Sequence, residues 1–583
     1  MASPLLTTFA VMVVNIVSCQ VQVTTKYGVI QGRMHTIEGK TLSTFFGVPF
    51  AKPPLGNLRF KKPQAAEPLT GVLNASDFGN SCMQRVSSEF PFPKNELSED
   101  CLTLNLYVPG DIYTNNSKAV MVWIYGGGYN AGASKKSNFT KFSVQGDVIV
   151  VSVNYRVGPF GFLTTGDVNV PGNAGLWDQI EGLKWVRDNI KHFGGDPNRV
   201  TIFGVSGGAG CVTQLSVTLA AKGLFHRFIS MSGTALGDWA FGNGLEGITT
   251  KMGDILNCNA SASDTPKLVA CLQRVDKALL LKASLQAAAN TSGFRPVVDG
   301  DMFPRPVAKM LQDTNSEVAR HFRSLDYMGG FLNSDGGGLF PFFSFNYSQG
   351  IDPDFMRDVL IPDVAKSISP HHQAEIAQNI QKTYFASASG DWGATARGYV
   401  DLNTDLAGGV PTIELLSYHL ALNTAGSSYL YYFTKEPSFG HLYPMPTWFR
   451  GPNHAEEMAF LLHGELSRSI NITFTEYEKD LCDKMVTYWT NFAKTGDPNR
   501  PIPLTVEWKQ YTKSDKHYIE FGDDIVSKMN LNPKRMELWL KTIPQILSRG
   551  TTPSPSCASG RIGTVLIPLA VFITLALTLL RIV

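Results

Sequence analysis

Apolar residues along this chain gather in short unbroken runs that glycine and polar residues separate. Such runs span 119–124, 200–203, 327–332 and 429–433. An unbroken apolar run of about four to eight residues bounded by turn residues is typical of a buried strand. The pattern therefore predicts a strand in each of these four ranges.

Two other stretches have the character of helices. In 478–492, apolar residues recur at helical intervals, at Leu481, Met485, Tyr488 and Phe492. Gly496 follows shortly afterwards, which fits a helix end. Residues 211–220, which come after the 200–203 strand and a glycine-rich turn, can also continue as a helix.

The turn between that strand and that helix reads Gly204-Val205-Ser206-Gly207-Gly208. Gly-x-Ser-x-Gly is the nucleophile-elbow pattern, in which a serine on a tight strand-to-helix turn has its hydroxyl pushed outward. The flanking residues are glycines because the backbone there is crowded and a Cβ would clash. Ser206 is therefore the candidate nucleophile.

A second glycine run, Tyr125-Gly126-Gly127-Gly128, follows the 119–124 strand. Bare backbone N–H groups in such a run can face a developing oxyanion. Either glycine motif alone is weak evidence, because most glycine turns are only turns. Both motifs together, each after a strand, indicate a serine hydrolase that works by acyl transfer.

A serine nucleophile needs a base and an orienting acid, which in such hydrolases follow in the order Ser, Asp or Glu, His. Asp335 lies just after the 327–332 strand beside a triple glycine, and it is the candidate acid. An aspartate at this position can also simply cap a turn. His454, one of 11 histidines, lies in a loop after the 429–433 strand and is the candidate base. From spacing alone, a structural histidine explains His454 almost as well.

Further motifs resemble the type-B carboxylesterase family, which includes cholinesterases and bile-salt-activated lipase. SEDCLTLN at 98–105 is similar to the family's second signature. Other matching stretches follow in family order: FGVPFAKPP at 46–54, NYRVGP at 154–159, FGGDPNR at 193–199 and YWTNFAKTGDPN at 488–499. The resemblance covers the chain from Val23 to Ile546.

The resemblance implies an α/β-hydrolase fold, with a large, mostly parallel central sheet flanked by helices. It implies a carboxylic ester hydrolase with a catalytic triad of Ser206, Asp335 and His454. The oxyanion donors that it implies are Gly127, Gly128 and Gly207. It pairs two sets of cysteines as disulfides, Cys82 with Cys101 and Cys258 with Cys271, and leaves Cys211 and Cys482 as buried thiols.

Two departures from the family pattern concern substrate choice. The residue before the nucleophile is usually Glu in this family and here is Val205. Cholinesterases also have a tryptophan whose ring binds a quaternary ammonium, and Leu73 stands where that residue would fall. The 82–101 loop contains Phe90 and Phe92 but no tryptophan. Because a cation pocket would lack both a carboxylate and this ring, we expect neutral acyl esters, lipid-like esters among them, rather than choline esters.

The resemblance also organises the chain coarsely. We expect short antiparallel strands and a disulfide loop in 20–107, and the central sheet with its crossing helices in 119–231. Residues 302–425 should be rich in helices, with 359–388 lying over the active-site mouth, before 429–546 returns to the sheet. Three aromatic residues are candidates for lining a gorge, although the core is the commoner place for them; these are Trp123, Trp239 and Phe294.

Composition narrows the possible partners. Of 583 residues, 43% are apolar and 17% charged, which is typical of a globular protein with a sizeable core. The formal net charge is only +2 and no block of Lys or Arg stands out, so we expect no nucleic-acid partner. The sequence has no P-loop and no Cys/His cluster at zinc spacing, and it predicts no cofactor and no metal. It does not indicate an oligomeric state.

The two ends predict an extracellular protein held at the cell surface. Residues 1–19 resemble a signal peptide, and 20–546 form the hydrolase domain. A Pro/Ser/Thr-rich stalk at 547–560 precedes an apolar tail at 561–583, which fits a GPI-attachment signal better than a transmembrane helix because no basic cluster follows it. Seven sequons support a glycoprotein, at Asn74, Asn115, Asn138, Asn259, Asn290, Asn346 and Asn471.

The alternative function is adhesion or recognition at the cell surface, because the resemblance extends to neuroligin-like proteins that have lost the nucleophile. The presence of Ser206, Asp335 and His454 together favours the hydrolase.

Overall fold

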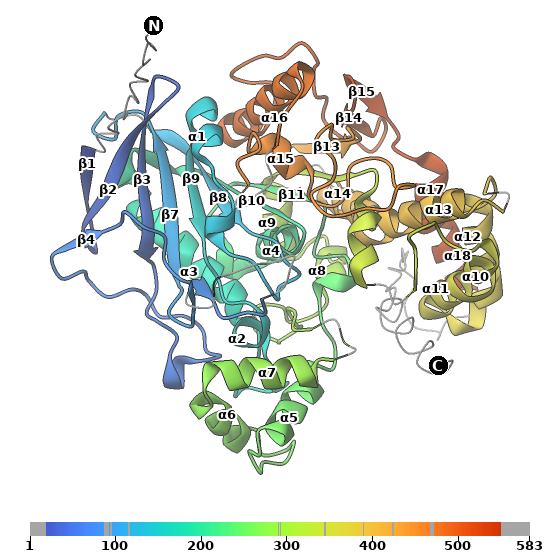
Figure 1. Cartoon of the computed structure of the whole chain (residues 1–583), viewed down its shortest axis with the longest axis horizontal. Coiled ribbons are helices and arrows are strands. Elements are labelled where there is room, and N and C mark those ends of the chain that lie inside the picture. The colour runs from blue at the N-terminus through green and yellow to red at the C-terminus, as the bar shows by residue number, and fades with distance from the viewer. Residues whose placement is uncertain are drawn as a thin grey trace, which may run out of the picture.

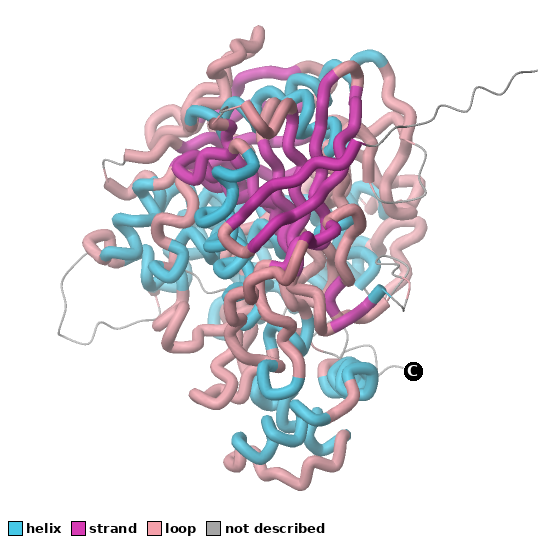
Figure 2. Tube along the Cα trace, turned by 90° about the vertical axis from the view of Figure 1, so that its left-hand side faces the viewer, coloured by secondary structure: helices cyan, strands magenta, loops and turns pink. Residues whose placement is uncertain are grey.

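A twisted sheet of 13 strands forms the centre of the molecule, with helices and loops around it (Figure 2). The structure is a computed structural model that describes residues 19–549 except 87–92, 94–95, 115–116, 290, 292, 343–344, 389, 423–424 and 467–471. The strands follow the order β1-β2-β3-β7-β9-β8-β10-β11-β12-β13-β14-β15, with β4 beside β2. A separate pair, β5 and β6, lies outside this sheet.

The strand bounds are as follows: β1 (Cys19–Thr25), β2 (Gly28–Ile37), β3 (Lys40–Pro49), β4 (Val72–Asn74), β5 (Ser81–Cys82), β6 (Leu97–Ser98), β7 (Thr103–Pro109), β8 (Lys118–Ile124), β9 (Ile149–Val153), β10 (Gly195–Val205), β11 (Arg227–Met231), β12 (Asp326–Leu332), β13 (Ser428–Phe433), β14 (His517–Phe521) and β15 (Ile525–Met529).

The centre of the sheet is parallel and its two edges are antiparallel. The strands from β9 across to β14 pair in parallel. At one edge β1, β2, β3 and β7 pair antiparallel in that order and join β9, and at the other edge β15 pairs antiparallel with β14. The short β4 pairs in parallel with β2. The four predicted strands are β8, β10, β12 and β13, all in the parallel part. Helices flank the parallel part of a sheet on both faces, so its strands are expected to carry largely apolar runs. The predicted large, mostly parallel sheet is confirmed.

The α-helices have these bounds: α1 (Thr140–Gly146), α2 (Gly158–Phe162), α3 (Ala174–Asn189), α4 (Gly207–Ser216), α5 (Leu245–Ile255), α6 (Thr265–Arg274), α7 (Lys277–Ala287), α8 (Val307–Gln312), α9 (Glu317–Ser324), α10 (Pro353–Phe355), α11 (Ile361–Ile368), α12 (Gln373–Tyr384), α13 (Trp392–Thr404), α14 (Val410–His419), α15 (Glu457–Leu461), α16 (Glu476–Thr495), α17 (Pro533–Glu537) and α18 (Ile543–Ser548).

Helix α16 shows how local sequence sets these bounds. It begins with a capping box, in which the Thr475 side chain accepts from the backbone of Glu478 and the Glu478 side chain accepts from the backbone of Thr475. It ends at Gly496, whose positive φ of 80° suits a residue without a Cβ. The helix packs on α1 and on strands β8 and β10. The prediction of a helix over 478–492 that ends near Gly496 is confirmed.

Helix α4 differs from its predicted bounds. It begins at Gly207, directly after the candidate nucleophile, and ends at Ser216, whereas the sequence predicted 211–220. The glycines at its start allow the backbone to close onto the sheet, and a short 3-10 turn at Leu219–Ala221 replaces its predicted last residues.

Two groups of helices extend from the sheet (Figure 1). One group consists of α5, α6 and α7. Within it, the Cys258–Cys271 disulfide joins the segment just after α5 to helix α6. The other includes α11 and α12, which pack against each other, while α12 also contacts α13 and the C-terminal helices α17 and α18. Helix α13 packs on the loop that bears the candidate acid, and the expectation that 359–388 lies over the active-site mouth stays a prediction.

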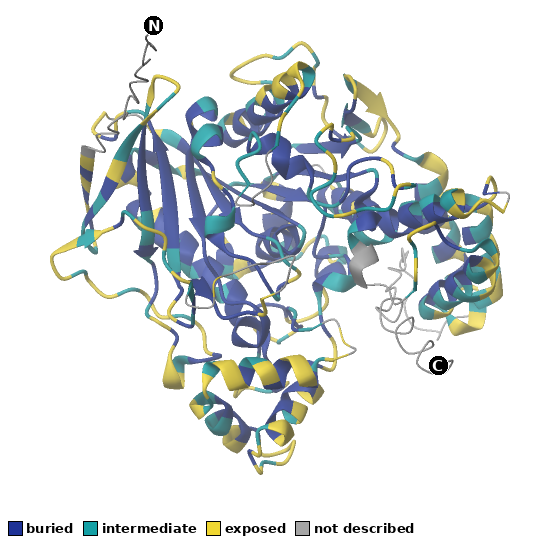
Figure 3. Cartoon of the chain, viewed as in Figure 1, coloured by how far each residue is buried: buried dark blue, intermediate teal, exposed yellow. Residues whose placement is uncertain are grey.

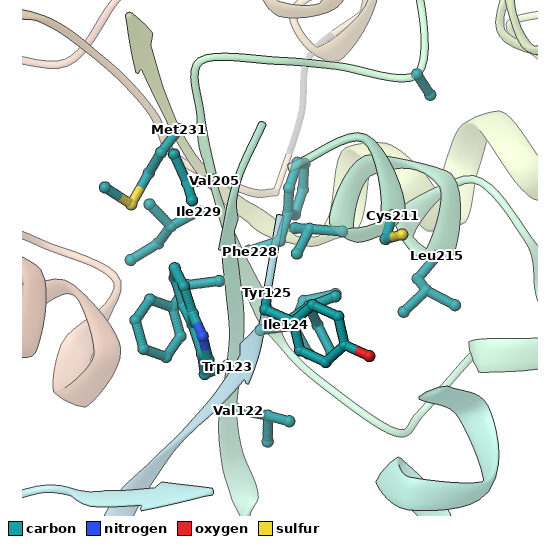
Figure 4. Close-up of a cluster of buried hydrophobic side chains, with 14 of the residues drawn as sticks. Val122, Trp123, Ile124, Tyr125, Val205, Cys211, Leu215, Phe228, Ile229 and Met231 are labelled. Carbon is teal, nitrogen blue, oxygen red and sulfur yellow. The ribbon is translucent and has the colours of Figure 1, made fainter. Parts of the chain in front are cut away.

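The centre of the sheet is also the centre of the core. Figure 3 shows its strands buried, whereas the outer faces of α5, α6 and α7 are exposed. Figure 4 shows the apolar side chains at the centre, among them Trp123, Val205 and Met231. In the described part of the chain, none of the helices has the length and apolar character needed to cross a membrane. The predicted signal peptide, stalk and tail lie outside the described residues, apart from short flanking segments.

Candidate active site

Ser206 occupies a strained turn between strand β10 and helix α4. Its backbone has φ 60° and ψ −127°, a conformation that costs a residue with a side chain on the order of 1–3 kcal/mol. The glycines on either side permit the turn: a Cβ on Gly204 would lie 2.6 Å from the carbonyl oxygen of Ile124, and one on Gly208 only 2.2 Å from the same atom. The sharp turn therefore depends on both glycines of the elbow motif.

The glycine run after β8 lies directly against this turn. A Cβ placed on Gly207 would be 2.9 Å from the backbone nitrogen of Gly128, and one on Gly126 would be 3.1 Å from the Cβ of Ser206. Gly127 and Gly128 both have positive φ, 120° and 58°. These contacts bring the run that holds the predicted oxyanion donors Gly127 and Gly128 against the turn that holds Ser206 and the third predicted donor, Gly207.

Two tyrosines hold the beginning of this glycine run in place. The hydroxyl of Tyr125 donates to the carbonyl oxygen of Tyr155 at 2.6 Å, and the hydroxyl of Tyr155 donates to the carbonyl oxygen of Tyr125 at 2.7 Å. Their rings stack with centroids 4.2 Å apart. Because both hydroxyls are buried and bonded, the run begins from a fixed point at the end of β8.

Asp335 and His454 meet at the same edge of the sheet. Asp335 follows β12 and His454 follows β13, and these two strands are parallel neighbours, so the loops after both of them leave from one edge. The Nδ1 atom of His454 lies 2.5 Å from Oδ1 of Asp335, which is a short hydrogen bond. The Asp335 side chain is 5% exposed and the His454 side chain is 31% exposed, so the acid is buried while the base reaches the surface of the site.

The base reaches the acid because glycines follow Asp335. A Cβ on Gly338 would lie 2.6 Å from the Cβ of His454. The triple glycine therefore marks close backbone approach rather than a flexible turn. Among the described residues, no hydrogen bond joins Ser206 to the His454 ring, and in free enzymes such a bond often forms only when substrate binds.

The environment of His454 favours its protonated form. Burial opposes the imidazolium, but the charge and hydrogen bond of Asp335 and the charge of Glu457 outweigh burial and raise the pKa of His454 above 6.5.

This shift predicts the pH dependence of turnover. Only neutral His454 can accept a proton, so kcat/KM should fall as the pH decreases through the raised pKa of His454. The midpoint of the acid limb should therefore lie above pH 6.5. Initial rates on a neutral p-nitrophenyl ester between pH 5 and 9 measure this midpoint. A midpoint below pH 6.5 would contradict the electrostatics of the Asp335–His454 pair.

Sequence reasoning did not identify Glu457, three residues after His454. Its side chain is fully buried, and the hydroxyl of Tyr431 lies 3.4 Å from Oε1. Burial and the neighbouring Asp335 carboxylate raise the pKa of Glu457 to about 8, although the charge of His454 opposes this shift. The only feature of the sequence that could have pointed to Glu457 is the pair of glutamates at 456–457. Acidic residues at a helix start are common, so this pair does not distinguish a site residue from an ordinary one.

Glu456 and Arg397 hold the loops that bear the base and the acid, and neither was predicted. The buried Glu456 carboxylate accepts from the backbone nitrogens of Asn453 at 2.7 Å and Leu442 at 2.9 Å. Arg397 of α13 donates to the carbonyl oxygens of Asn333 and Arg450, both at 2.9 Å. Because one side chain bonds both loops, α13 helps to fix the acid relative to the base.

The structure separates the three aromatic candidates for a gorge. Trp123 and Phe294 are each 2% exposed and belong to the core. Trp239 is half-buried and lies near the elbow, because a Cβ on Gly233 would lie 2.7 Å from its ring and 3.0 Å from the carbonyl oxygen of Ser206. Of the three candidates, Trp239 is therefore the one that lies near the elbow.

The two positions at which the sequence departs from the family pattern, Val205 and Leu73, lie in apolar surroundings. Val205 is 7% exposed and belongs to the central apolar cluster (Figure 4). Leu73 is half-buried in β4, opposite Ile30 of β2. Phe90 and Phe92 lie outside the described residues.

The cysteines and sequons occupy positions suited to their expected roles. Cys82 bonds Cys101 and Cys258 bonds Cys271, while Cys211 and Cys482 are buried free thiols. Asn115, Asn290 and Asn471 lie outside the described residues. The four described sequon asparagines are all exposed, as glycosylation requires; they are Asn74, Asn138, Asn259 and Asn346.

Comparison with known proteins adds independent evidence. The sequence profile described as "Carboxylesterase family" matches residues 19–539. Bile salt-activated lipase from Bos taurus is 31% identical over 91% of this chain and 89% of its own length. Carboxylesterase 3 from Homo sapiens is 32% identical over 90% of this chain and 91% of its own. Neuroligin-2 from Mus musculus is 29% identical over 90% of this chain and 68% of its own.

Proposed function

The chain belongs to the carboxylesterase family, and we propose that it is a serine-dependent hydrolase of neutral carboxylic esters. The esterase and lipase relatives support ester hydrolysis. The observation that carries the serine mechanism is the 2.5 Å hydrogen bond between Asp335 and His454 at the sheet edge that also bears the Ser206 turn.

In the proposed mechanism, Ser206 Oγ attacks the ester carbonyl while Nε2 of His454 accepts the hydroxyl proton. Asp335 accepts the hydrogen bond from Nδ1–H, holds the ring in the required tautomer and stabilises the imidazolium. The N–H groups of Gly127, Gly128 and Gly207 stabilise the tetrahedral oxyanion. The imidazolium then protonates the leaving alcohol, and water releases the acid from the acyl-enzyme by the same steps.

Surface recognition without catalysis is the second candidate, because neuroligin-2 is among the relatives. Adhesion does not need a serine on a strained turn, a buried acid bonded to a histidine, or amides around the serine. The presence of all three features favours the hydrolase.

The apolar character of Val205 predicts substrate preference. A cationic alcohol group needs a carboxylate or an aromatic face, and the positions of the two family cation ligands hold Val205 and Leu73. Kinetics on matched pairs, such as butyrylcholine and its uncharged 3,3-dimethylbutyl isostere, should show higher kcat/KM for the neutral ester. The same pairs with longer acyl chains test whether lipid-like esters are preferred. A choline ester preferred tenfold over its isostere would overturn this assignment.

We also propose that the protein is secreted and held at the outer cell surface by a lipid anchor. Small residues at 556–559, a short spacer and the apolar segment from Val565 follow the order of a GPI signal. A phosphatidylinositol-specific phospholipase should therefore release esterase activity from intact expressing cells. As a control, release of the inactive Ser206→Ala protein is detected with an antibody, which shows whether the protein leaves the cells independently of its activity. Activity that stays on the cells, with residues 565–583 still in the mature chain, would establish a transmembrane helix instead.

A further inference from the structure

Asn130, two residues after the glycine run, joins that run to a distant loop. Its side-chain nitrogen donates to the carbonyl oxygens of Gly128 at 2.7 Å and Phe294 at 3.0 Å. Its side-chain oxygen accepts from the backbone nitrogen of Phe294 at 3.0 Å. Both N–H donors and the oxygen of the amide are therefore in use, and one of these bonds is to the predicted oxyanion loop.

The backbone of Asn130 makes a second contact with the glycine run 126–128. Its nitrogen donates to the carbonyl oxygen of Gly127 at 3.0 Å, as does that of Ala131 at 3.1 Å. Asn130 thus bonds the carbonyl oxygens of both Gly127 and Gly128. In a trans peptide the C=O and the following N–H point in opposite directions. Fixing these two carbonyls therefore fixes the directions of the N–H groups of Gly128 and Tyr129.

These N–H groups are the ones beside the nucleophile. The nitrogens of Gly128 and Tyr129 lie 2.9 and 3.1 Å from the Cβ position of Gly207, the first residue after Ser206. Glycines lose more conformational freedom than other residues when they are fixed, and the run contains three of them in sequence. An oxyanion site works through donors that already point at the developing charge.

We propose that Asn130 is a positioning residue that orients the N–H groups of Gly128, a proposed oxyanion donor, and of Tyr129, and couples them to the 293–297 loop. This inference rests on the proposed hydrolase function. Asn130 itself does not touch the reacting atoms. Its backbone holds the peptide plane between Gly127 and Gly128, and its side chain holds the next plane, between Gly128 and Tyr129, and so fixes the C-terminal side of the Gly128 donor. The plain alternative is that Asn130 only clamps the 293–297 loop to the body of the protein.

Asn173 provides a matched control within the same structure. Its side-chain nitrogen donates to the carbonyl oxygen of Val297 at 2.9 Å, and its oxygen accepts from the nitrogen of Val297 at 2.9 Å. Asn173 therefore clamps the same loop three residues further along. Its remaining donor bonds Asp299 at 2.8 Å and not the oxyanion loop. If clamping were the whole role of Asn130, removal of either side chain would have similar effects.

The test compares Asn130→Ala with Asn173→Ala in the full-length protein. We measure kcat and KM on a p-nitrophenyl ester, the inhibition constant of a trifluoromethyl ketone, which forms an oxyanion on the serine, and the melting temperature. In Asn130→Ala, kcat should fall about 10- to 100-fold with KM nearly unchanged, and ketone affinity should fall by a similar factor. Asn173→Ala should lower the melting temperature but change kcat and ketone affinity by less than about threefold.

A second variant covers the case in which Asn130→Ala does not fold. Asn130→Asp keeps the oxygen that accepts from the nitrogen of Phe294 and removes the donors to the carbonyl oxygens of Gly128 and Phe294, so it should lose kcat and ketone affinity in the same way. Equal effects of the Asn130 and Asn173 variants on kcat and ketone affinity would overturn the inference. A wild-type protein without Ser206-dependent hydrolysis would instead overturn the proposed function, and the inference with it.

Discussion

Replacement of Ser206 by alanine should reduce kcat/KM for a p-nitrophenyl ester about a thousandfold or more. The hydroxyl is the only group that the mechanism uses to form the acyl-enzyme, and alanine removes it without adding bulk to the crowded turn. The oxyanion amides and the binding surface remain, so a small residual rate above that of water is expected. Steady-state kinetics on the purified variant measure the loss.

A control serine separates chemistry from folding. Ser216 lies at the other end of α4, where its buried hydroxyl donates to the carbonyl oxygen of Thr213 at 2.7 Å. Ser216→Ala should keep kcat/KM within about threefold of wild type. Wild-type turnover by Ser206→Ala would show that another group is the nucleophile.

Replacement of Asp335 by asparagine should cost about 10⁴-fold in kcat, by analogy with the same change in other serine hydrolases. The amide would present an N–H group to Nδ1 of His454, now 2.5 Å from a carboxylate oxygen. The ring would then carry its proton on Nε2, where it could not accept the proton of Ser206. Kinetics at several pH values, with circular dichroism to verify folding, measure this effect.

An exposed carboxylate provides the comparison for this change. Asp354 on α10 pairs with Arg357 at the surface, and Asp354→Asn should leave kcat within about threefold. A folded Asp335→Asn variant with kcat within tenfold of wild type would mean that Asp335 only caps its turn. That was the alternative left open by the sequence.

The sequence predicted the features that depend on local patterns. The strands β8, β10, β12 and β13 each contain a largely apolar run, which is the pattern expected of parallel strands that flanking helices bury, although β10 begins five residues before its run, at Gly195. The elbow was recognisable because steric limits within a single turn require glycine at these positions. Asp335 and His454 stood out because each follows such a strand, and neighbouring parallel strands end at one edge.

Features that depend on contacts between distant segments were not predictable in the same way. The Arg397 bonds join α13 to loops about sixty residues away on either side of it in the sequence, and no spacing rule connects them. The pKa of Glu457 depends on burial beside Asp335, which a run of two glutamates does not reveal. The contacts of α12 with α13, α17 and α18 were not predictable either, because an amphipathic pattern gives a buried face but not the partner of that face.

The central claim is that Ser206 is the nucleophile activated by His454 and Asp335. The most direct measurement is labelling of the folded protein with a fluorophosphonate, which reacts with an activated serine, followed by mass spectrometry of the digested chain. We expect one adduct per chain, on Ser206, formed much more slowly in a His454→Ala variant and absent in Ser206→Ala. An adduct on another residue, or equal labelling of wild type and Ser206→Ala, would contradict it.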